Sequence, residues 1–135
     1  LLTAVQVLYG AFMAGKKAGW GYDTWPDMDG DFLPAGAFAT GNAWHEDGTT
    51  IHFIHRTLAW ILLVGVAVWF RAAVRLRPGV AWAVLAALVM QFVLGVLTVV
   101  HSVPVVLGVG HQAGACALLA ALTVALHPGS EELTT

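Results

Sequence analysis

The chain has 135 residues, of which 59% are hydrophobic and only 10% are charged. Ordinary soluble domains carry about 25% charged residues, so this composition leaves too little polar surface for a soluble domain of this length. The net charge of −2 excludes the strongly basic surface that nucleic-acid-binding proteins present. The sequence therefore indicates a membrane protein with no nucleic-acid partner.

Four apolar stretches are candidates for membrane-spanning helices. A bilayer core takes roughly 20 apolar residues per helix, and residues 51–74, 80–103 and 105–126 supply them. Residues 1–15 would extend only about 22 Å as a helix. We therefore expect this first span to be truncated, and the chain to be the C-terminal part of a longer protein. The predicted fold class is all-α, a transmembrane four-helix bundle.

Proline and glycine mark the ends of these spans. Pro78 and Gly79 lie between the second and third spans, and Pro104 lies between the third and fourth. Pro128 and Gly129 follow the fourth span and are expected to end it, leaving a short polar tail. The last three spans are thus predicted to be joined by very short turns.

The charges predict the orientation of the bundle. Arg71, Arg75 and Arg77 crowd the connection after the second span, and cytoplasmic connections carry an excess of Lys and Arg. Residues 16–50 are then an extracytoplasmic loop, although its Lys16 and Lys17 argue the other way. This loop is long for a bundle, where two to eight residues are usual. Its many glycines, prolines, aspartates and tryptophans predict a packed cap, since disordered segments contain few aromatic residues.

Two of the six histidines lie inside predicted spans. His55 is about four residues into the second span and His111 about six into the fourth, which puts both roughly 6–9 Å below the outer boundary. Both spans run from outside to inside, so the two imidazoles reach matching depth. Ionisable side chains at membrane depth are costly and usually functional. Two histidines at one level of a helical bundle are a typical arrangement for ligating haem iron from opposite faces.

The neighbours of these histidines are compatible with a haem site. Gly110 and Gly114 flank His111, and small residues at this spacing allow the close approach of a backbone or a flat macrocycle. Arg56 follows His55 near the outer boundary, where its guanidinium can pair with a haem propionate. Each feature also has a simpler interpretation. Membrane histidines form interhelical hydrogen bonds, glycines four apart serve helix packing, and an arginine at this depth can snorkel to the interface.

The other histidines leave alternatives open. His52 shares a helix face with His55 and can compete as a ligand, although it lies nearer the interface. His101 is near the outer surface and can support the site. His45 is expected to be solvated, and His127 to mark the inner end of the last span. A zinc site built from several histidines is disfavoured, because neither a second cysteine nor a buried carboxylate accompanies the central pair.

Short motifs along nearly the whole chain resemble the second half of haem A synthase. They occur in the family's order, as Gln6–Gly15, Ala18–Gly19, Tyr22–Gly30, Phe53–Arg56, Gln91–Gly95 with Thr98, and Val103–Pro104 leading to His111–Gln112. Three positions depart from the family's pattern. Asp23 stands where Asn is expected and Asp27 where Leu is expected, so the loop is more acidic than usual. His52 stands where Gln is expected.

The resemblance implies a specific function. Members are eight-helix membrane proteins made of two similar four-helix halves, each with a histidine pair near the outer face. They oxidise a ring methyl of haem O to the formyl group of haem A for cytochrome oxidase. The second half, here residues 1–135, holds a b-type haem with His55 and His111 as axial ligands. The catalytic carboxylate and the substrate haem O belong to the first half, so no catalytic residue is expected in this chain.

The family also implies a multi-pass location in a bacterial plasma membrane, with haem O synthase and an electron acceptor as possible partners. Bis-histidine ligation leaves no open position on the iron, which suits electron transfer rather than oxygen chemistry. Two other functions remain as alternatives on the residues alone. One is a stand-alone membrane cytochrome b module for electron transfer, and the other is a helical transporter subunit without haem.

Overall fold

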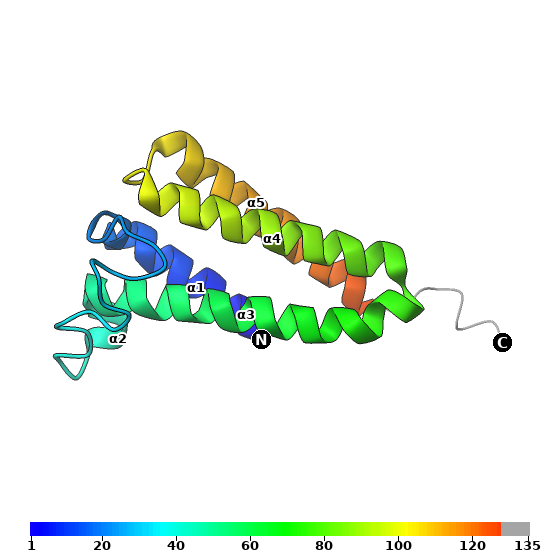
Figure 1. Cartoon of the computed structure of the whole chain (residues 1–135), viewed down its shortest axis with the longest axis horizontal. Coiled ribbons are helices and arrows are strands. Elements are labelled where there is room, and N and C mark those ends of the chain that lie inside the picture. The colour runs from blue at the N-terminus through cyan, green and yellow to red at the C-terminus, as the bar shows by residue number, and fades with distance from the viewer. Residues whose placement is uncertain (128–135) are drawn as a thin grey trace.

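The computed structural model describes residues 1–127 as helices joined by one long loop and two short turns (Figure 1). The bundle consists of α1 (Leu2–Gly15), α3 (Gly48–Leu76), α4 (Pro78–Val100) and α5 (Val105–Leu126). The loop contains a single turn of 3-10 helix, η1 (Ala18–Trp20), and the short α2 (Ala43–Glu46). Helices α3, α4 and α5 are long and apolar enough to cross a membrane, and α1 is a shorter apolar helix. The predicted all-helical membrane fold is confirmed.

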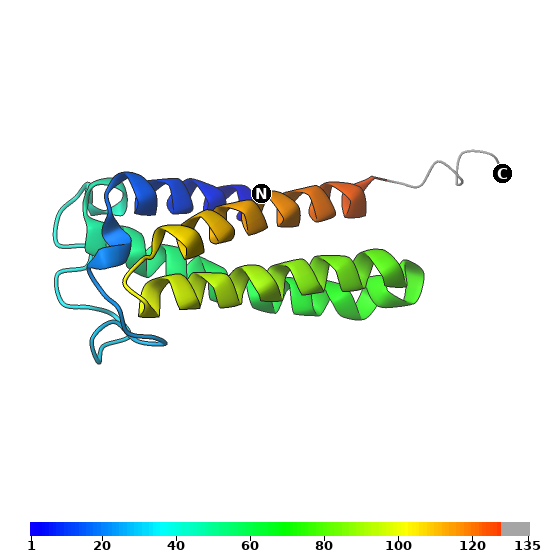
Figure 2. The same cartoon turned by 90° about the horizontal axis from the view of Figure 1, so that it is seen from above.

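The four helices occupy the corners of a square. Helix α3 packs against both α1 and α4, and α4 packs against α5. Figure 1 shows α1 beside α3 and α4 beside α5, whereas Figure 2 shows α1 level with α5 and α4 level with α3. Helices α3 and α5 are therefore diagonal partners, as are α1 and α4. We call the end that carries the loop and the α4–α5 turn the loop end, and the end with the α3–α4 turn the hairpin end.

Helix α3 begins three residues before the predicted span because of a side-chain cap. The Asp47 carboxylate accepts hydrogen bonds of 2.7 Å from both the backbone N–H and the hydroxyl of Thr50. Such a cap satisfies a donor that the first helical turn leaves free. These two hydrogen bonds favour the ionised form and hold the pKa of Asp47 below its ordinary value. The start of α3 is thus fixed at the loop end.

Helix α4 ends at Val100, three residues before the predicted end of this span. Ser102 and Val103 both adopt left-handed backbone conformations, with φ of 56° and 58°. The Val103 N–H donates to the Thr98 carbonyl at 2.8 Å, which closes the end of the helix. Pro104 then restricts the residue before it to non-helical conformations. The short turn between α4 and α5 is therefore built from strained residues ahead of a proline.

Buried apolar side chains form one cluster between α3, α4 and α5. Its members are Leu62, Val66, Val84, Leu88 and Leu118. Many other large apolar side chains on these helices are exposed, as membrane-facing surfaces require; examples are Val64, Val68, Val106 and Val124. The cluster holds the three long helices together, and it leaves the loop-end part of the bundle interior to other side chains.

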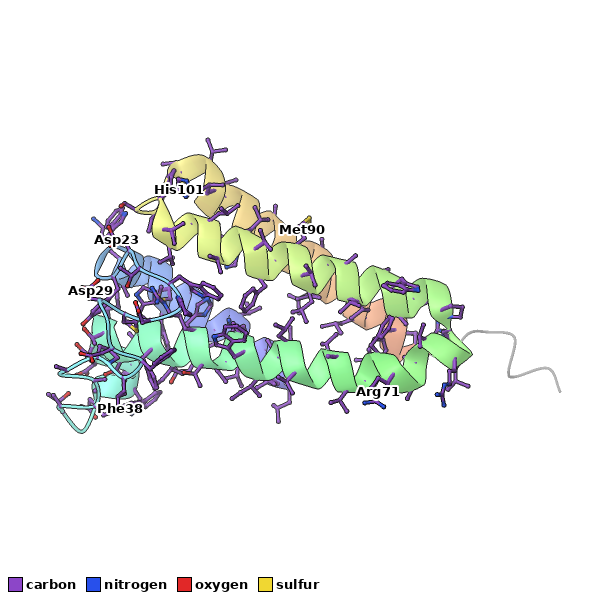
Figure 3. The ribbon with its side chains drawn as sticks, in the orientation of Figure 1. Asp23, Asp29, Phe38, Arg71, Met90 and His101 are labelled. Carbon is purple, nitrogen blue, oxygen red and sulfur yellow. The ribbon has the colours of Figure 1, made fainter. Side chains whose placement is uncertain are left out.

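The loop is packed rather than extended, as its composition predicted. Met28 is only 2% exposed and Ala43 only 1% exposed. The acids lie at the loop end, where Figure 3 labels Asp23 and Asp29, and Arg71 lies toward the hairpin end. At that end Arg77 donates to the carbonyls of Ala125 and His127. The predicted helix stop at Pro128 and Gly129 lies outside the described residues.

Candidate functional site: a histidine pair at the loop end of the bundle

His55 on α3 and His111 on α5 meet across the diagonal of the bundle. Their ring centroids are 6.5 Å apart, and the ring planes are inclined by 82°. Two imidazoles that bind one ion through nitrogens at roughly 2.0–2.1 Å have centroids about 6 Å apart. The proximity expected from their matching depth is therefore confirmed. That they ligate a haem iron stays a prediction.

Each of these imidazoles lies against a glycine of an adjacent helix. A Cβ atom added to Gly10 on α1 would be 3.5 Å from Cε1 of His55. A Cβ atom added to Gly95 on α4 would be only 3.0 Å from Cε1 of His111. The second distance is below normal van der Waals separation, so Gly95 is needed for the ring to lie where it does.

Each imidazole also has a glutamine amide beside it. The amide nitrogen of Gln6 on α1 lies 3.3 Å from Nδ1 of His55 and donates to the His55 carbonyl at 3.2 Å. The amide nitrogen of Gln91 on α4 lies 3.4 Å from Nε2 of His111. The sequence-based search for ligands missed both glutamines. A signal in the sequence could have identified them. In two apolar spans a glutamine precedes a glycine by four residues, as Gln6 and Gly10 and as Gln91 and Gly95.

The two glycines that flank His111 have different roles. A Cβ atom on Gly114 would overlap Oε1 of Gln91, whereas one on Gly110 would meet nothing within 4 Å. Gly114 is thus required for the packing of Gln91 rather than for clearance beside the imidazole. The helix-packing interpretation therefore applies to Gly114, and clearance for a cofactor beside His111 stays a prediction.

Several buried polar atoms at this site have no hydrogen-bond partner among the described residues. They are Oε1 of Gln6, Oε1 of Gln91 and Nδ1 of His111. Buried polar atoms in native proteins are normally paired, so these atoms mark a place where a further group belongs. Two imidazoles with ring centroids 6.5 Å apart, each beside a glutamine whose amide oxygen has no partner, are compatible with the donor set of a bis-histidine haem, in which ligand histidines also need hydrogen-bond acceptors. The residues fit that group.

Arg56 ties α3 to the loop. Its Nε donates to Nε2 of His52 at 2.9 Å, and one terminal nitrogen donates to the Tyr22 carbonyl at 3.3 Å. Its other terminal nitrogen donates to the Asp27 carbonyl. These contacts engage three of the five N–H groups of a guanidinium. The predicted pairing of Arg56 with a haem propionate would use the remaining two.

The structure places the other histidines away from the central pair's contacts. His52 is fully buried; its Nε2 accepts from Arg56, and its Nδ1 has no hydrogen-bond partner among the described residues, so its role as a competing ligand stays a prediction. His45 packs on Trp44 and lies 3.6 Å from a Glu46 carboxylate oxygen, so it is not simply solvated. His101 is exposed at the α4–α5 turn, where its Nδ1 contacts the Leu97 carbonyl. His127 makes the same contact with the Thr123 carbonyl near the hairpin end.

A loop tryptophan contacts both α3 and α4. Trp25 stacks on Trp60 of α3 with a centroid distance of 5.7 Å and an interplanar angle of 21°. Its ring meets Phe92 of α4 edge to face at 6.0 Å, and Trp60 and Phe92 are themselves 5.1 Å apart. The loop therefore contributes one ring to an aromatic cluster on these two helices, and Phe92 in this cluster is next in sequence to Gln91.

Within residues 1–127, no three His, Cys, Asp or Glu side chains gather closely enough to hold a metal ion. Two cavities, of about 220 and 330 Å³, open among side chains that include Trp69 and Ala125, and no histidine lines either one. The donor set that the described residues offer to a metal is thus a pair of neighbouring imidazoles, whereas structural zinc takes four ligands.

Comparison with known proteins places this chain in a family. The model of the COX15-CtaA family, described as cytochrome oxidase assembly protein, matches residues 1–123. A haem A synthase of Paramagnetospirillum magneticum is 44% identical over 131 residues, which cover 93% of this chain and 37% of that protein. One of Rhizorhabdus wittichii is 40% identical over 131 residues, covering 94% of this chain and 38% of that protein.

The chain thus spans less than two fifths of the length of these relatives. No solved structure matches it. Three long apolar helices, together with bacterial relatives of this kind, make it a multi-pass protein of the bacterial inner membrane. By the match to its family model over 123 of its residues, the chain belongs to the haem A synthase family of cytochrome oxidase assembly proteins.

Proposed function

We propose that this chain is the C-terminal half of an eight-helix haem A synthase, and that His55 and His111 bind the iron of a b-type haem within it. The observation that carries the proposal is the 6.5 Å separation of the two imidazole rings across the bundle. Bound in this way, the group would supply one-electron transfer, because two histidine ligands would leave no open position on the iron.

The chain's own residues have distinct tasks in this proposal. His55 and His111 would supply the two ligands from the diagonal helices α3 and α5. Gly95 provides clearance beside His111, and the apolar spans exclude water. Arg56 keeps the loop against α3 and has two N–H groups left for a propionate.

The activity proposed for the whole protein is the oxidation of a haem O methyl group to the formyl group of haem A. It is supported by the relatives, which are named haem A synthase. The catalytic residues and the haem O site are assigned to the N-terminal half of the whole protein. Haem O synthase and an electron acceptor are the proposed partners, and the loop end faces the extracytoplasmic side, because the arginines gather at the hairpin end.

The test compares three single histidine variants of the full-length protein that contains this segment, purified in detergent. His55→Ala and His111→Ala should each lose the low-spin bis-histidine absorption spectrum and most of the bound haem b. His52→Ala is the matched control, because it removes a buried histidine one turn from His55 and should keep that spectrum. Retention of the low-spin spectrum by both His55→Ala and His111→Ala would refute the ligand assignment.

A further inference from the structure

The surroundings of the two histidines follow the same pattern on opposite sides of the bundle. Gln6 and Gly10 on α1 lie beside His55, and Gln91 and Gly95 on α4 lie beside His111. In both cases the glycine lies against Cε1 of the ring and the glutamine is four residues earlier on the same helix. The nitrogen that it approaches differs, because the Gln6 amide is nearest Nδ1 of His55 and the Gln91 amide is nearest Nε2 of His111. Since α1 and α4 are diagonal partners, an approximate twofold axis passes between the two imidazoles.

A glutamine inside an apolar span requires a reason. An amide moved out of water without hydrogen bonds costs free energy, so such a residue is retained where its polar atoms are used. The Gln6 amide nitrogen donates to the His55 carbonyl across the α1–α3 contact, but Oε1 of both glutamines is buried without a partner among the described residues, so helix packing does not use the two oxygens. The same amides lie within 3.4 Å of an imidazole nitrogen. The amides are therefore placed to act on the histidines.

The chemistry of a metal-binding imidazole supplies that use. When one ring nitrogen binds a metal, the other carries a proton and needs a hydrogen-bond acceptor, which fixes the orientation of the ring. The oxygen and nitrogen of a side-chain amide are close in size, and rotation of the amide exchanges them. A rotation of this kind brings the free amide oxygen of Gln91 to the position beside the ring. For Gln6 it does the same while giving up the hydrogen bond to the His55 carbonyl.

We propose that Gln6 and Gln91 are a matched pair of positioning residues, each accepting a hydrogen bond from the ring nitrogen of His55 or His111 that does not bind iron. This inference rests on the proposed haem ligation by the histidines. An acceptor on the N–H makes the imidazole a stronger donor, which favours ferric over ferrous iron. The two glutamines thereby help to set the reduction potential of the site.

The experiment measures the midpoint potential and the ferric EPR spectrum of the full-length protein in detergent. Gln6→Leu and Gln91→Leu remove the acceptor, and each should shift the equilibrium toward ferrous iron about two- to tenfold, the range that one hydrogen bond supplies. Gln6→Glu and Gln91→Glu keep the shape of the side chain and strengthen the acceptor, so they should shift it toward ferric iron. Gln112→Leu is the matched control, because Gln112 is next to His111 but exposed, and it should change neither readout.

The outcomes separate this inference from the proposed function. If wild-type protein shows bis-histidine haem and both leucine variants keep its potential and EPR spectrum, the inference is wrong while the ligand assignment stands. If the wild-type spectrum is not that of a bis-histidine haem, the proposed function is wrong, and the inference that rests on it is wrong as well. Should the leucine variants lose haem, the glutamate variants decide: a lowered potential supports the inference, and an unchanged or raised one overturns it.

Discussion

Replacement of Gly95 by alanine tests the close fit between α4 and His111. The added Cβ would lie 3.0 Å from Cε1, 3.5 Å from Nδ1 and 3.6 Å from Nε2 of the ring. Carbon atoms prefer separations of about 3.5–4.0 Å, so the ring or the helix has to move by roughly 0.5–1 Å. Overpacking of this kind typically costs about 1–3 kcal/mol, whereas alanine in a helix gains up to about 1 kcal/mol over glycine. The overlap should win, so Gly95→Ala should destabilise the protein.

Gly10 on α1 and Gly110 on α5 provide two controls in which an added Cβ would be less crowded than at Gly95. Gly10→Ala places its Cβ at an ordinary 3.5 Å from His55 and should have a smaller effect, and Gly110→Ala meets open space and should be neutral or stabilising. The assay is the thermal midpoint in detergent together with the haem content per protein, from Soret absorbance. Equal stability and equal haem content in the Gly95 and Gly110 variants would show that the contact beside His111 has no energetic consequence.

Three further changes address the loop end. Asp47→Ala should lower the free energy of unfolding by about 1 kcal/mol at neutral pH. Because the pKa of Asp47 is depressed in the folded protein, this difference should disappear as acidification protonates the carboxylate. A difference in thermal midpoint that persists at strongly acidic pH would contradict the cap. Ser102→Gly should stabilise the protein by up to about 1 kcal/mol, because a left-handed backbone costs other residues roughly 1–2 kcal/mol, and thermal midpoints should show no such gain for Ser102→Ala. Arg56→Gln should accelerate hydrogen exchange of residues 16–50 relative to wild type, and unchanged exchange would mean that Arg56 does not hold the loop.

The helices were predictable because composition and proline positions determine them. The apolar stretches are long enough to leave no other assignment, and the span at residues 105–126 coincides with α5. The start of α3 and the end of α4 were harder to predict from the sequence. The start of α3 depends on whether the Asp47 side chain turns back onto Thr50. The end of α4 depends on Ser102 and Val103, which adopt left-handed conformations that sequence patterns do not favour.

The histidine pair was predictable in depth but its surroundings were not. Counting residues from the helix starts gives the level of His55 and His111 in the bundle. Counting does not give the rotation of one helix against another, and rotation decides that Gln6 and Gln91 lie beside the rings. Arg56 shows the same limit, since its position near the boundary was clear but its carbonyl partners come from a folded loop.

Trp25 gives the loop a mechanical role in the bundle. The α3 and α4 ribbons diverge from the hairpin end toward the loop end (Figure 1). The Trp25 ring contacts Trp60 of α3 and Phe92 of α4, and these two rings also contact each other at 5.1 Å. The three rings form one aromatic cluster, so the loop helps to tie the two helices together. Cutting the polypeptide within residues 26–47 would leave Trp25 attached to α1 alone and weaken a contact that joins α3 to α4.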